Sequence, residues 1–147
     1  MRKLIEYIRG DIFSTDCEAI VCPVNTVGVM GKGLALEFKR RYAPDMFYAY
    51  RQLCFNGTLK LGCPAIYTKY NPAIIFFPTK DNWRNDSNIW SIETGLESDV
   101  MHKALTLYHS IAFPKLGCGC GNLSWDEVKH SMESHLSNTS NRIVIYV

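Results

Sequence analysis

Short apolar runs alternate along the chain with segments whose apolar positions recur every three to four residues. The apolar runs predict strands, because a strand that is buried on both faces carries apolar side chains at consecutive positions. The predicted strands cover residues 3–9, 19–24, 64–69, 73–77, 110–114 and 142–147. Strands that alternate with helices are typical of an α/β fold, in which helices cover a central sheet.

Two helices are predicted between the second and third strands. Residues 31–42 carry Leu34, Phe38 and Tyr42 at a spacing of four, which places all three on one helical face. A proline opens the next predicted helix, residues 44–54, because proline fits the first turn of a helix.

Two more helices are predicted in the second half of the chain. The first begins at a cap formed by Ser87 or Asn88 and continues to about Tyr108. The second begins at Ser124, which with Glu127 forms a Ser-x-x-Glu pattern and predicts a capping box.

The composition fits one domain that spans residues 1–147. Of the 147 residues 47% are hydrophobic and 20% are charged, which suffices for one core and excludes a disordered chain. A net charge of +2 permits contact with phosphates without requiring nucleic acid. The basic cluster Lys32, Lys39, Arg40 and Arg41 fits either a solvated helix face or a phosphate contact.

Six cysteines raise the question of disulfides or a metal site: Cys17, Cys22, Cys54, Cys63, Cys118 and Cys120. Several lie in apolar runs and no signal-peptide pattern precedes them, so we expect reduced thiols in a cytoplasmic protein. Their spacing matches no zinc site, and we expect no metal and no cofactor. The apolar runs are too short to span a membrane.

Two glycine-rich segments, residues 25–33 and 117–122, each follow a predicted buried strand and precede a helix. In that geometry, backbone N–H groups point outward at a helix N-terminus, where the helix dipole favours anions. Neither segment has the spacing of a Walker A loop or of a dinucleotide-binding fingerprint. Together they predict a site that clasps a diphosphate at the carboxyl ends of the strands.

Polar residues at strand ends are the candidates for specific contacts. Asp11 fits an acceptor for an amino group such as that of adenine, or equally a turn residue after Gly10. Asn25 fits a ribose contact or a loop cap. No Ser-His-Asp pattern and no paired catalytic carboxylates are recognisable.

Lys80 leaves an apolar strand at its carboxyl end, where the polar segment 79–88 begins. A partly desolvated lysine there can act as a base or attack an aldehyde. The alternative is a solvated lysine or a phosphate clamp, and the residues by themselves favour it. Trp83 and Arg84 beside it form a pair suited to stacking on a base and holding a phosphate, or to simple packing.

Taken together, these segments resemble macrodomains over nearly the whole chain. The resemblance implies a three-layer α/β/α fold with a central mixed six-stranded sheet, and it places Asp11 at adenine and Asn25 at the distal ribose. It implies that ADP-ribose contacts Asp11, Ile12, Asn25, Val29, Met30, Gly31, Lys32, Gly33, Leu34, Thr79, Leu116, Gly117, Cys118, Gly119, Cys120, Gly121, Asn122 and Leu123.

A narrower resemblance, to the DarG-like branch that removes ADP-ribose from thymidine in DNA, rests on three strings. They are Asn-Thr-Val-Gly-Val-Met-Gly-Lys-Gly, Phe-Pro-Thr-Lys with a following Trp-Arg, and Pro-Lys-Leu-Gly-Cys-Gly. A lysine is catalytic in that branch, and the likeness puts Lys80 at its position, which reverses the preference stated above. It also implies DNA contacts at Trp83 and Arg84.

Three departures from related patterns bear on the chemistry. MacroD-type hydrolases carry Asn-Ala-Ala-Asn where this chain has residues 25–28, so their water-activating geometry is not expected. Gly121 occupies the place of an acidic residue in the terminal ADP-ribose glycohydrolase. DarG-like loops read Gly-Gly-Leu-Asp-Trp where residues 121–125 read Gly-Asn-Leu-Ser-Trp.

We therefore expect an ADP-ribosyl hydrolase that acts on ADP-ribosylated single-stranded DNA, as a monomer from a bacterium or a phage. Two alternatives stay open. One is a non-catalytic module that binds ADP-ribose or a related nucleotide. The other is a hydrolase of ADP-ribosylated protein, of ADP-ribose 1″-phosphate or of an acylated ADP-ribose.

Overall fold

The computed structural model describes residues 5–147, so the first two residues of the first predicted strand lie outside the described residues. Its sheet has six strands in the order β1-β6-β5-β2-β4-β3. Only β3 runs antiparallel to its neighbour among the described strands. The strands are β1 (Glu6–Ile8), β2 (Ala19–Asn25), β3 (Ala65–Tyr67), β4 (Ala73–Lys80), β5 (Ser110–Phe113) and β6 (Arg142–Tyr146).

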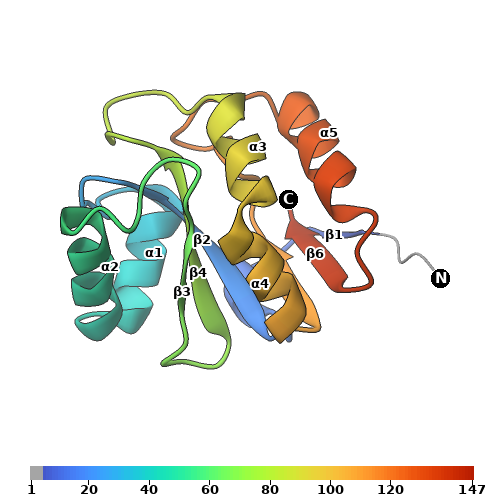
Figure 1. Ribbon diagram of the computed structural model, residues 1–147, viewed down its shortest axis with the longest axis horizontal. Coiled ribbons are helices and arrows are strands. Elements are labelled where there is room, and N and C mark those ends of the chain that lie inside the picture. The colour runs from blue at the N-terminus through green and yellow to red at the C-terminus, as the bar shows by residue number, and fades with distance from the viewer. Residues whose placement is uncertain (1–4) are drawn as a thin grey trace.

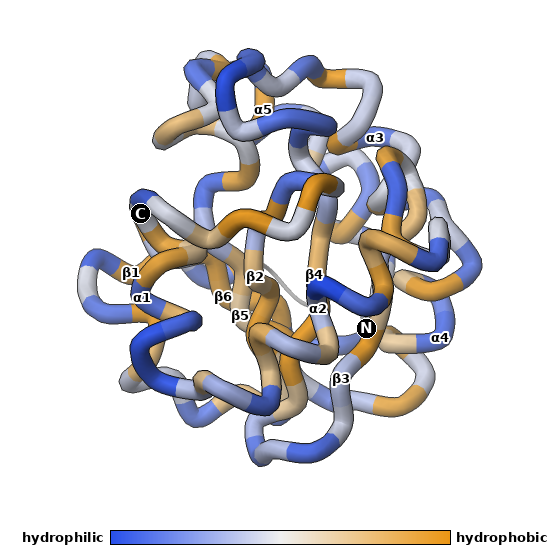
Figure 2. The backbone as a smooth tube through the Cα atoms, turned by 90° about the vertical axis from the view of Figure 1, so that its left-hand side faces the viewer, coloured by the Kyte–Doolittle hydropathy of each residue, from blue (hydrophilic) through white to orange (hydrophobic). Residues whose placement is uncertain are grey.

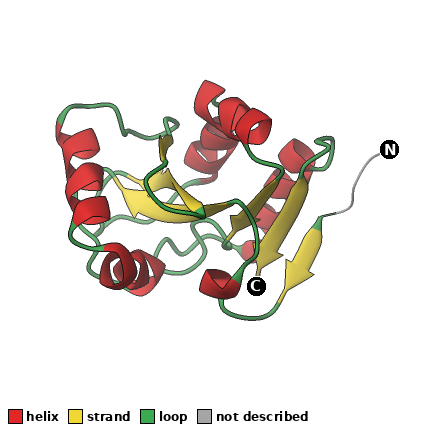
Figure 3. Ribbon diagram, turned by 90° about the horizontal axis from the view of Figure 1, so that it is seen from below, coloured by secondary structure: helices red, strands yellow, loops and turns green. Residues whose placement is uncertain are grey.

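Five α-helices and a short 3₁₀ helix, η1 (Ile12–Ser14), connect the strands. Two helices cover one face of the sheet and three cover the other, so the expected three-layer architecture around a mixed six-stranded sheet is confirmed (Figure 1, Figure 3). The first pair is α1 (Gly33–Tyr42) and α2 (Asp45–Phe55). The second group is α3 (Ile89–Glu97), α4 (Asp99–Leu107) and α5 (Trp125–Leu136).

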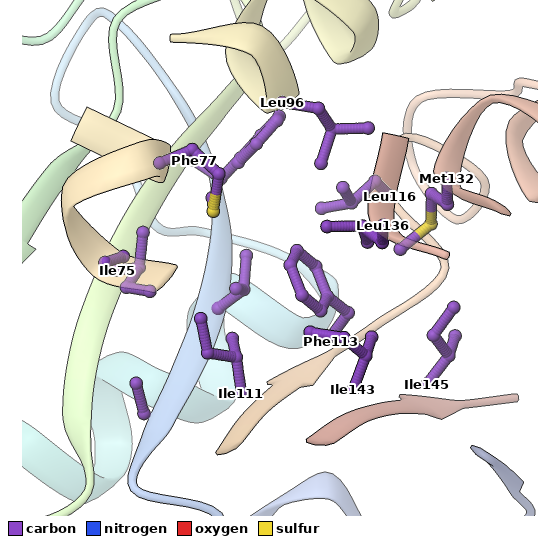
Figure 4. Close-up of a cluster of buried hydrophobic side chains, with 14 of the residues drawn as sticks. Ile75, Phe77, Leu96, Ile111, Phe113, Leu116, Met132, Leu136, Ile143 and Ile145 are labelled. Carbon is purple, nitrogen blue, oxygen red and sulfur yellow. The ribbon is translucent and has the colours of Figure 1, made fainter. Parts of the chain in front are cut away.

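Two apolar cores lie on the two faces of the sheet. In β2, Ala19 and Val21 point into the core beneath α3, α4 and α5, whereas Ile20 and Cys22 point into the core beneath α1 and α2. Figure 4 shows the first core, in which Phe113 lies among side chains from β4, β6 and α5. The central strands are coloured mainly hydrophobic in Figure 2, as the apolar runs predicted.

The helix predicted from residue 88 to residue 108 is wrong as a single element, because the chain breaks at Ser98 into α3 and α4. Ser98 has extended backbone angles, and its Oγ accepts a hydrogen bond from the Met101 N–H at 3.2 Å. The same hydroxyl donates to the carbonyl of Gly95 at 2.7 Å. Ser98 thus satisfies a carbonyl at the end of α3 and an N–H at the start of α4. Serine favours helix caps over helix interiors because its hydroxyl bonds to nearby backbone groups.

Helix starts differ from the prediction in two places. Asn88 caps α3 by accepting from the Ser91 N–H at 3.0 Å, so the alternative cap at Ser87 is not used. Ser124 is the N-cap of α5, but its side chain makes no capping hydrogen bond, so the predicted capping box does not form. Asp126 and Glu127 lie in the first turn of α5, where their charges favourably face the helix dipole.

Candidate functional site

The carboxyl ends of the parallel strands β2, β4 and β5 meet at one edge of the sheet and open into a cavity of about 570 Å³. Two loops form its walls: the first loop, residues 26–32 after β2, and the second loop, residues 114–123 after β5. The lining is Pro23, Val24, Asn25, Val29, Gly31, Lys32, Gly33, Leu34, Ala35, Thr79, Lys80, Trp83, Pro114, Lys115, Gly117, Gly119, Cys120, Gly121 and Tyr146.

Lys80 is the last residue of β4, which is three residues longer than predicted. It pairs with Asn25 across the sheet, next to an irregularity between Val24 and Asn25. Its Nζ donates to the carbonyl oxygen of Cys120 at 3.0 Å and to that of Trp83 at 3.2 Å. The half-buried amine is therefore fixed between the second loop and the segment that follows β4, inside the cavity.

Asn25 organises the first loop from its buried position. Its Nδ2 donates to the carbonyl of Val29 at 2.7 Å, and its Oδ1 accepts from the N–H of Val27 at 3.1 Å. The Tyr50 hydroxyl donates to the same Oδ1 at 2.7 Å. Burial raises the pKa of Tyr50 far above its usual value, so this hydroxyl stays a neutral donor. The loop-cap interpretation of Asn25 thus describes its contacts, while its side chain also lines the cavity.

Replacing Tyr50 by Phe removes the donor and leaves the buried Asn25 oxygens short of a partner. We expect a loss of about 1–3 kcal/mol in the free energy of unfolding, together with weaker binding of the ADP-ribose that the sequence resemblance implies. Thermal melts and calorimetric titration measure the two effects. Tyr48→Phe on the same helix is the matched control, because Tyr48 is 67% exposed and should tolerate the change. Equal melting and equal affinity in both variants would refute this role of Tyr50.

The second loop is braced from outside by residues 85–88. The Ser87 N–H donates to the carbonyl of Gly121 at 2.9 Å, and the Asn122 Nδ2 donates to Asp86 Oδ1 at 2.8 Å. Gly117 has φ +73°, and a methyl group there would lie 2.8 Å from Leu123 Cδ1. The loop conformation therefore depends on the absence of a side chain at this glycine.

The second loop approaches the first glycine-rich segment where α1 begins. A methyl group on Gly33 would lie 3.2 Å from the Cys120 sulfur, so the start of α1 and the second loop are in close proximity. This arrangement matches the predicted clasp in position, with a helix N-terminus at one wall.

A second hollow of about 370 Å³ extends the site toward Asp11 and Ile12, and it shares Leu34, Pro114 and Tyr146 with the larger cavity. Asp11 Oδ1 accepts from the Phe13 N–H at 2.9 Å, and Arg41 lies 3.8 Å from the other carboxylate oxygen. Asp11 thus also serves as the turn residue that the spacing suggested. The two hollows are therefore adjacent, and together they are called the groove below.

Some of the residues that were expected at the site do not line either hollow. Met30 and Leu116 are fully buried in the two cores, and Cys118 and Leu123 pack partly buried against one of them. Asn122 braces the second loop, and the Arg84 guanidinium lies 4.7 Å from the centre of the Trp83 ring. Apart from Trp83, none of these residues is part of the lining.

Tyr146, Pro114 and Lys115 also line the cavity, although none of them was expected at the site from the sequence. Tyr146 is the last residue of β6, a strand parallel to β5, so its carboxyl end opens at the same edge of the sheet. Because the carboxyl ends of parallel strands meet at one edge of the sheet, this position is one where a site residue is expected.

Burial raises the pKa of the Cys118 thiol, and all six cysteines are free.

Within residues 5–147, no group of three His, Cys, Asp or Glu side chains is arranged to hold a metal ion. The helices of this part of the chain are all too short or too polar to cross a bilayer.

Comparison with known proteins shows the family to which the chain belongs. Residues 21–132 match the Macro domain family. DNA ADP-ribosyl glycohydrolase of Thermus aquaticus is 41% identical over 137 residues, which cover 90% of this chain and 38% of that protein. The protein of the same name from Mycobacterium tuberculosis is 41% identical over 135 residues, 89% of this chain and 38% of its own length. The chain thus spans about two fifths of the curated relatives that it matches.

Solved structures agree in fold over almost the whole chain. The macrodomain of Mycobacterium tuberculosis DarG superposes with a TM-score of 0.89 at 40% identity, covering 97% of both chains. Thermosipho africanus DarTG, solved in complex with ADP-ribose, superposes with a TM-score of 0.88 at 34% identity, covering 95% of this chain and 40% of that one. The chain therefore belongs to the Macro domain family and is similar, in sequence and in structure, to the macrodomains of DarG proteins.

Proposed function

We propose that this chain removes ADP-ribose from ADP-ribosylated DNA, with thymidine as the modified nucleoside. The observation that carries the proposal is the position of Lys80, whose Nζ is held by two backbone carbonyls inside a groove walled by two glycine-rich loops. The similarity to DNA ADP-ribosyl glycohydrolases at 41% identity supports the same reaction.

The groove accommodates an extended dinucleotide-like ligand in one orientation. Adenine occupies the smaller hollow, between Asp11 and Tyr146, because an exposed carboxylate accepts from an amino group and an aromatic ring stacks on a base. The diphosphate lies between the two loops, at the N-terminus of α1. The distal ribose then reaches the end where Asn25 and Lys80 pair across the sheet. The Thermosipho protein solved with ADP-ribose supports such a site.

The reaction breaks the bond between the anomeric carbon of the distal ribose and a nitrogen of the base. A water oxygen becomes bonded to that carbon, one proton of the water is released, and the departing nitrogen regains a proton. Lys80 acts beside this carbon, where a lysine serves as a proton-transfer group, as a fixed charge or as a transient nucleophile. Trp83 and Arg84, at the mouth of the cavity, contact the DNA.

We also propose that the protein is monomeric and cytoplasmic and that it works without a metal or other cofactor. The free cysteines support a reducing compartment.

A panel of substrates tests the proposal and its alternatives. The purified protein is incubated with single-stranded DNA carrying ADP-ribose on thymidine, with a protein ADP-ribosylated on glutamate, and with ADP-ribose 1″-phosphate. We expect release of ADP-ribose and recovery of unmodified thymidine from the DNA at a rate at least about a hundredfold above the other two. Preference for another member of the panel would contradict DNA as the substrate. Tight binding of ADP-ribose without turnover of any member would indicate a non-catalytic binding module.

A further inference from the structure

We infer that the single strand on either side of the modified nucleotide is bound by two aromatic-cationic surfaces along one rim of the cavity. One is the Trp83–Arg84 pair named above. The other is a surface of α1 and α2 formed by Lys39, Phe47, Arg51 and Phe55, which we call the α2 platform. This inference rests on the proposed function, because it assigns the path of the DNA that carries the scissile bond.

The α2 platform alternates cations and aromatic rings. The Arg51 guanidinium carbon lies 5.1 Å from the ring centre of Phe55 and 5.8 Å from that of Phe47. The Lys39 Nζ lies 4.3 Å from the Phe47 ring centre. Phe55 is 63% exposed at the end of α2, although a phenylalanine is ordinarily buried. An exposed ring beside a guanidinium offers one face for stacking on a base and one charge for a phosphate.

The α2 platform adjoins the first loop directly. A methyl group on Gly28 would lie 3.5 Å from Arg51 Cγ and 3.6 Å from Phe55 Cε1, so the loop backbone rests on the platform. Val29, the next residue of the first loop, is partly exposed to solvent and also lines the cavity. A strand that leaves the cavity over this loop therefore reaches Phe55 and Arg51 first.

The first loop also connects the α2 platform to Trp83. The N–H and the Oγ of Thr26 both donate to the carbonyl of Asp81, at 3.1 and 3.0 Å. Asp81 begins the loop that carries Trp83, so these hydrogen bonds tie that loop to the first loop. The first loop therefore links the segment that carries Trp83 to Phe55, through Thr26 at one end and Gly28 at the other.

The charges of the rim favour a nucleic acid strand over an apolar partner. Lys39, Arg51 and Arg84 each lie over an aromatic ring, and none of them makes an ion pair within the part of the chain that the structure describes. Their charges therefore remain available for phosphates. A base that enters the cavity must leave the stack, so its neighbours exit along the rim and lose stacking that the aromatic rings replace.

The test compares a short and a long substrate in one assay. The short substrate is the ADP-ribosylated thymidine mononucleotide, and the long one is a 12-nucleotide single strand with the same modification at its centre. The double variant Arg51→Ala/Phe55→Ala is compared with Lys103→Ala/Leu107→Ala, which removes an exposed cation and an exposed apolar side chain from α4 on the opposite face of the sheet.

For the wild type, we expect kcat/KM to be at least about tenfold higher for the long substrate than for the short one. The α2 platform variant should lose about tenfold or more on the long substrate, remain within about twofold on the short one, and show a shallower salt dependence of binding. The α4 control should match the wild type on both. Equal losses of the platform variant on both substrates, or no loss on the long one, would overturn the strand path.

The outcome separates this inference from the proposed function. If the wild type hydrolyses both substrates equally well, the hydrolase proposal stands and the strand path is wrong. If it hydrolyses neither, the hydrolase proposal fails, and fluorescence anisotropy with the unmodified 12-nucleotide strand then decides the path. Weaker binding by the platform variant than by the α4 control supports the path, and equal binding contradicts it.

Discussion

Lys80→Ala should abolish turnover of ADP-ribosylated DNA while leaving the protein folded. The amine is held within the cavity by the carbonyls of Cys120 and Trp83, so its removal takes away the group nearest the proposed scissile bond. Loss of a positioned proton-transfer or charged group typically lowers the rate by about 10²–10⁴-fold. The ADP-ribose affinity should change by less than about tenfold, because most of the groove is unaltered. Single-turnover rates and calorimetric titration measure the two quantities.

Lys80→Arg distinguishes among the roles of the lysine. An arginine keeps the positive charge but is not a nucleophile, so activity within about tenfold of wild type would assign Lys80 an electrostatic role. Loss comparable to that of Lys80→Ala would assign a role to the amine itself, which reductive trapping with borohydride can detect as a covalent adduct. Lys103→Ala serves as the control. Full activity of Lys80→Ala would remove the lysine from the mechanism.

Gly121→Ala should destroy the ADP-ribose site through the shape of the second loop. A methyl group at this position would lie 2.5 Å from the carbonyl oxygen of Gly117 and 2.3 Å from the Ser87 hydroxyl. Contacts this short force the loop to move, at a cost of about 1–3 kcal/mol. We expect a lower melting temperature and a loss of ADP-ribose affinity of at least about tenfold, measured by thermal melts and titration.

The matched control is Gly119→Ala in the same loop, where an added methyl group meets no atom within 4 Å. Its melting temperature should equal that of the wild type. Adding Ser87→Gly to Gly121→Ala should not restore binding, because the contact with the Gly117 backbone remains. Wild-type affinity in Gly121→Ala would show that the loop is more adaptable than its contacts indicate.

The strands were predictable because a strand buried between two helical layers must be apolar on both sides, as in residues 19–24 and 110–113. Because the carboxyl ends of parallel strands meet at one edge of the sheet, the sequence also indicated that Lys80, Asn25 and the two loops lie together. The six-stranded mixed sheet itself came from the family resemblance, since the order of strands depends on long-range packing that local patterns do not record.

Other features were outside the reach of local patterns. The break at Ser98 depends on one hydroxyl that serves two helix ends at once, and an amphipathic pattern continues across it. The polar segment 79–88 predicts a loop, but β4 continues to Lys80, whose pairing with Asn25 follows an irregularity in β2 that local patterns do not record. Arg51 and Phe55 lie on a helix face that local patterns do not distinguish, and only tertiary contacts place them beside Gly28.

We propose that this groove hydrolyses the bond between ADP-ribose and a DNA base. The most direct measurement is incubation of the purified wild-type protein and Lys80→Ala with a single-stranded oligonucleotide carrying ADP-ribose on one thymidine, followed by mass spectrometry of the DNA. We expect the wild type to return the unmodified oligonucleotide together with free ADP-ribose, and Lys80→Ala to leave the modified strand intact. A strand that stays modified in the presence of wild-type protein that binds ADP-ribose would contradict this proposal.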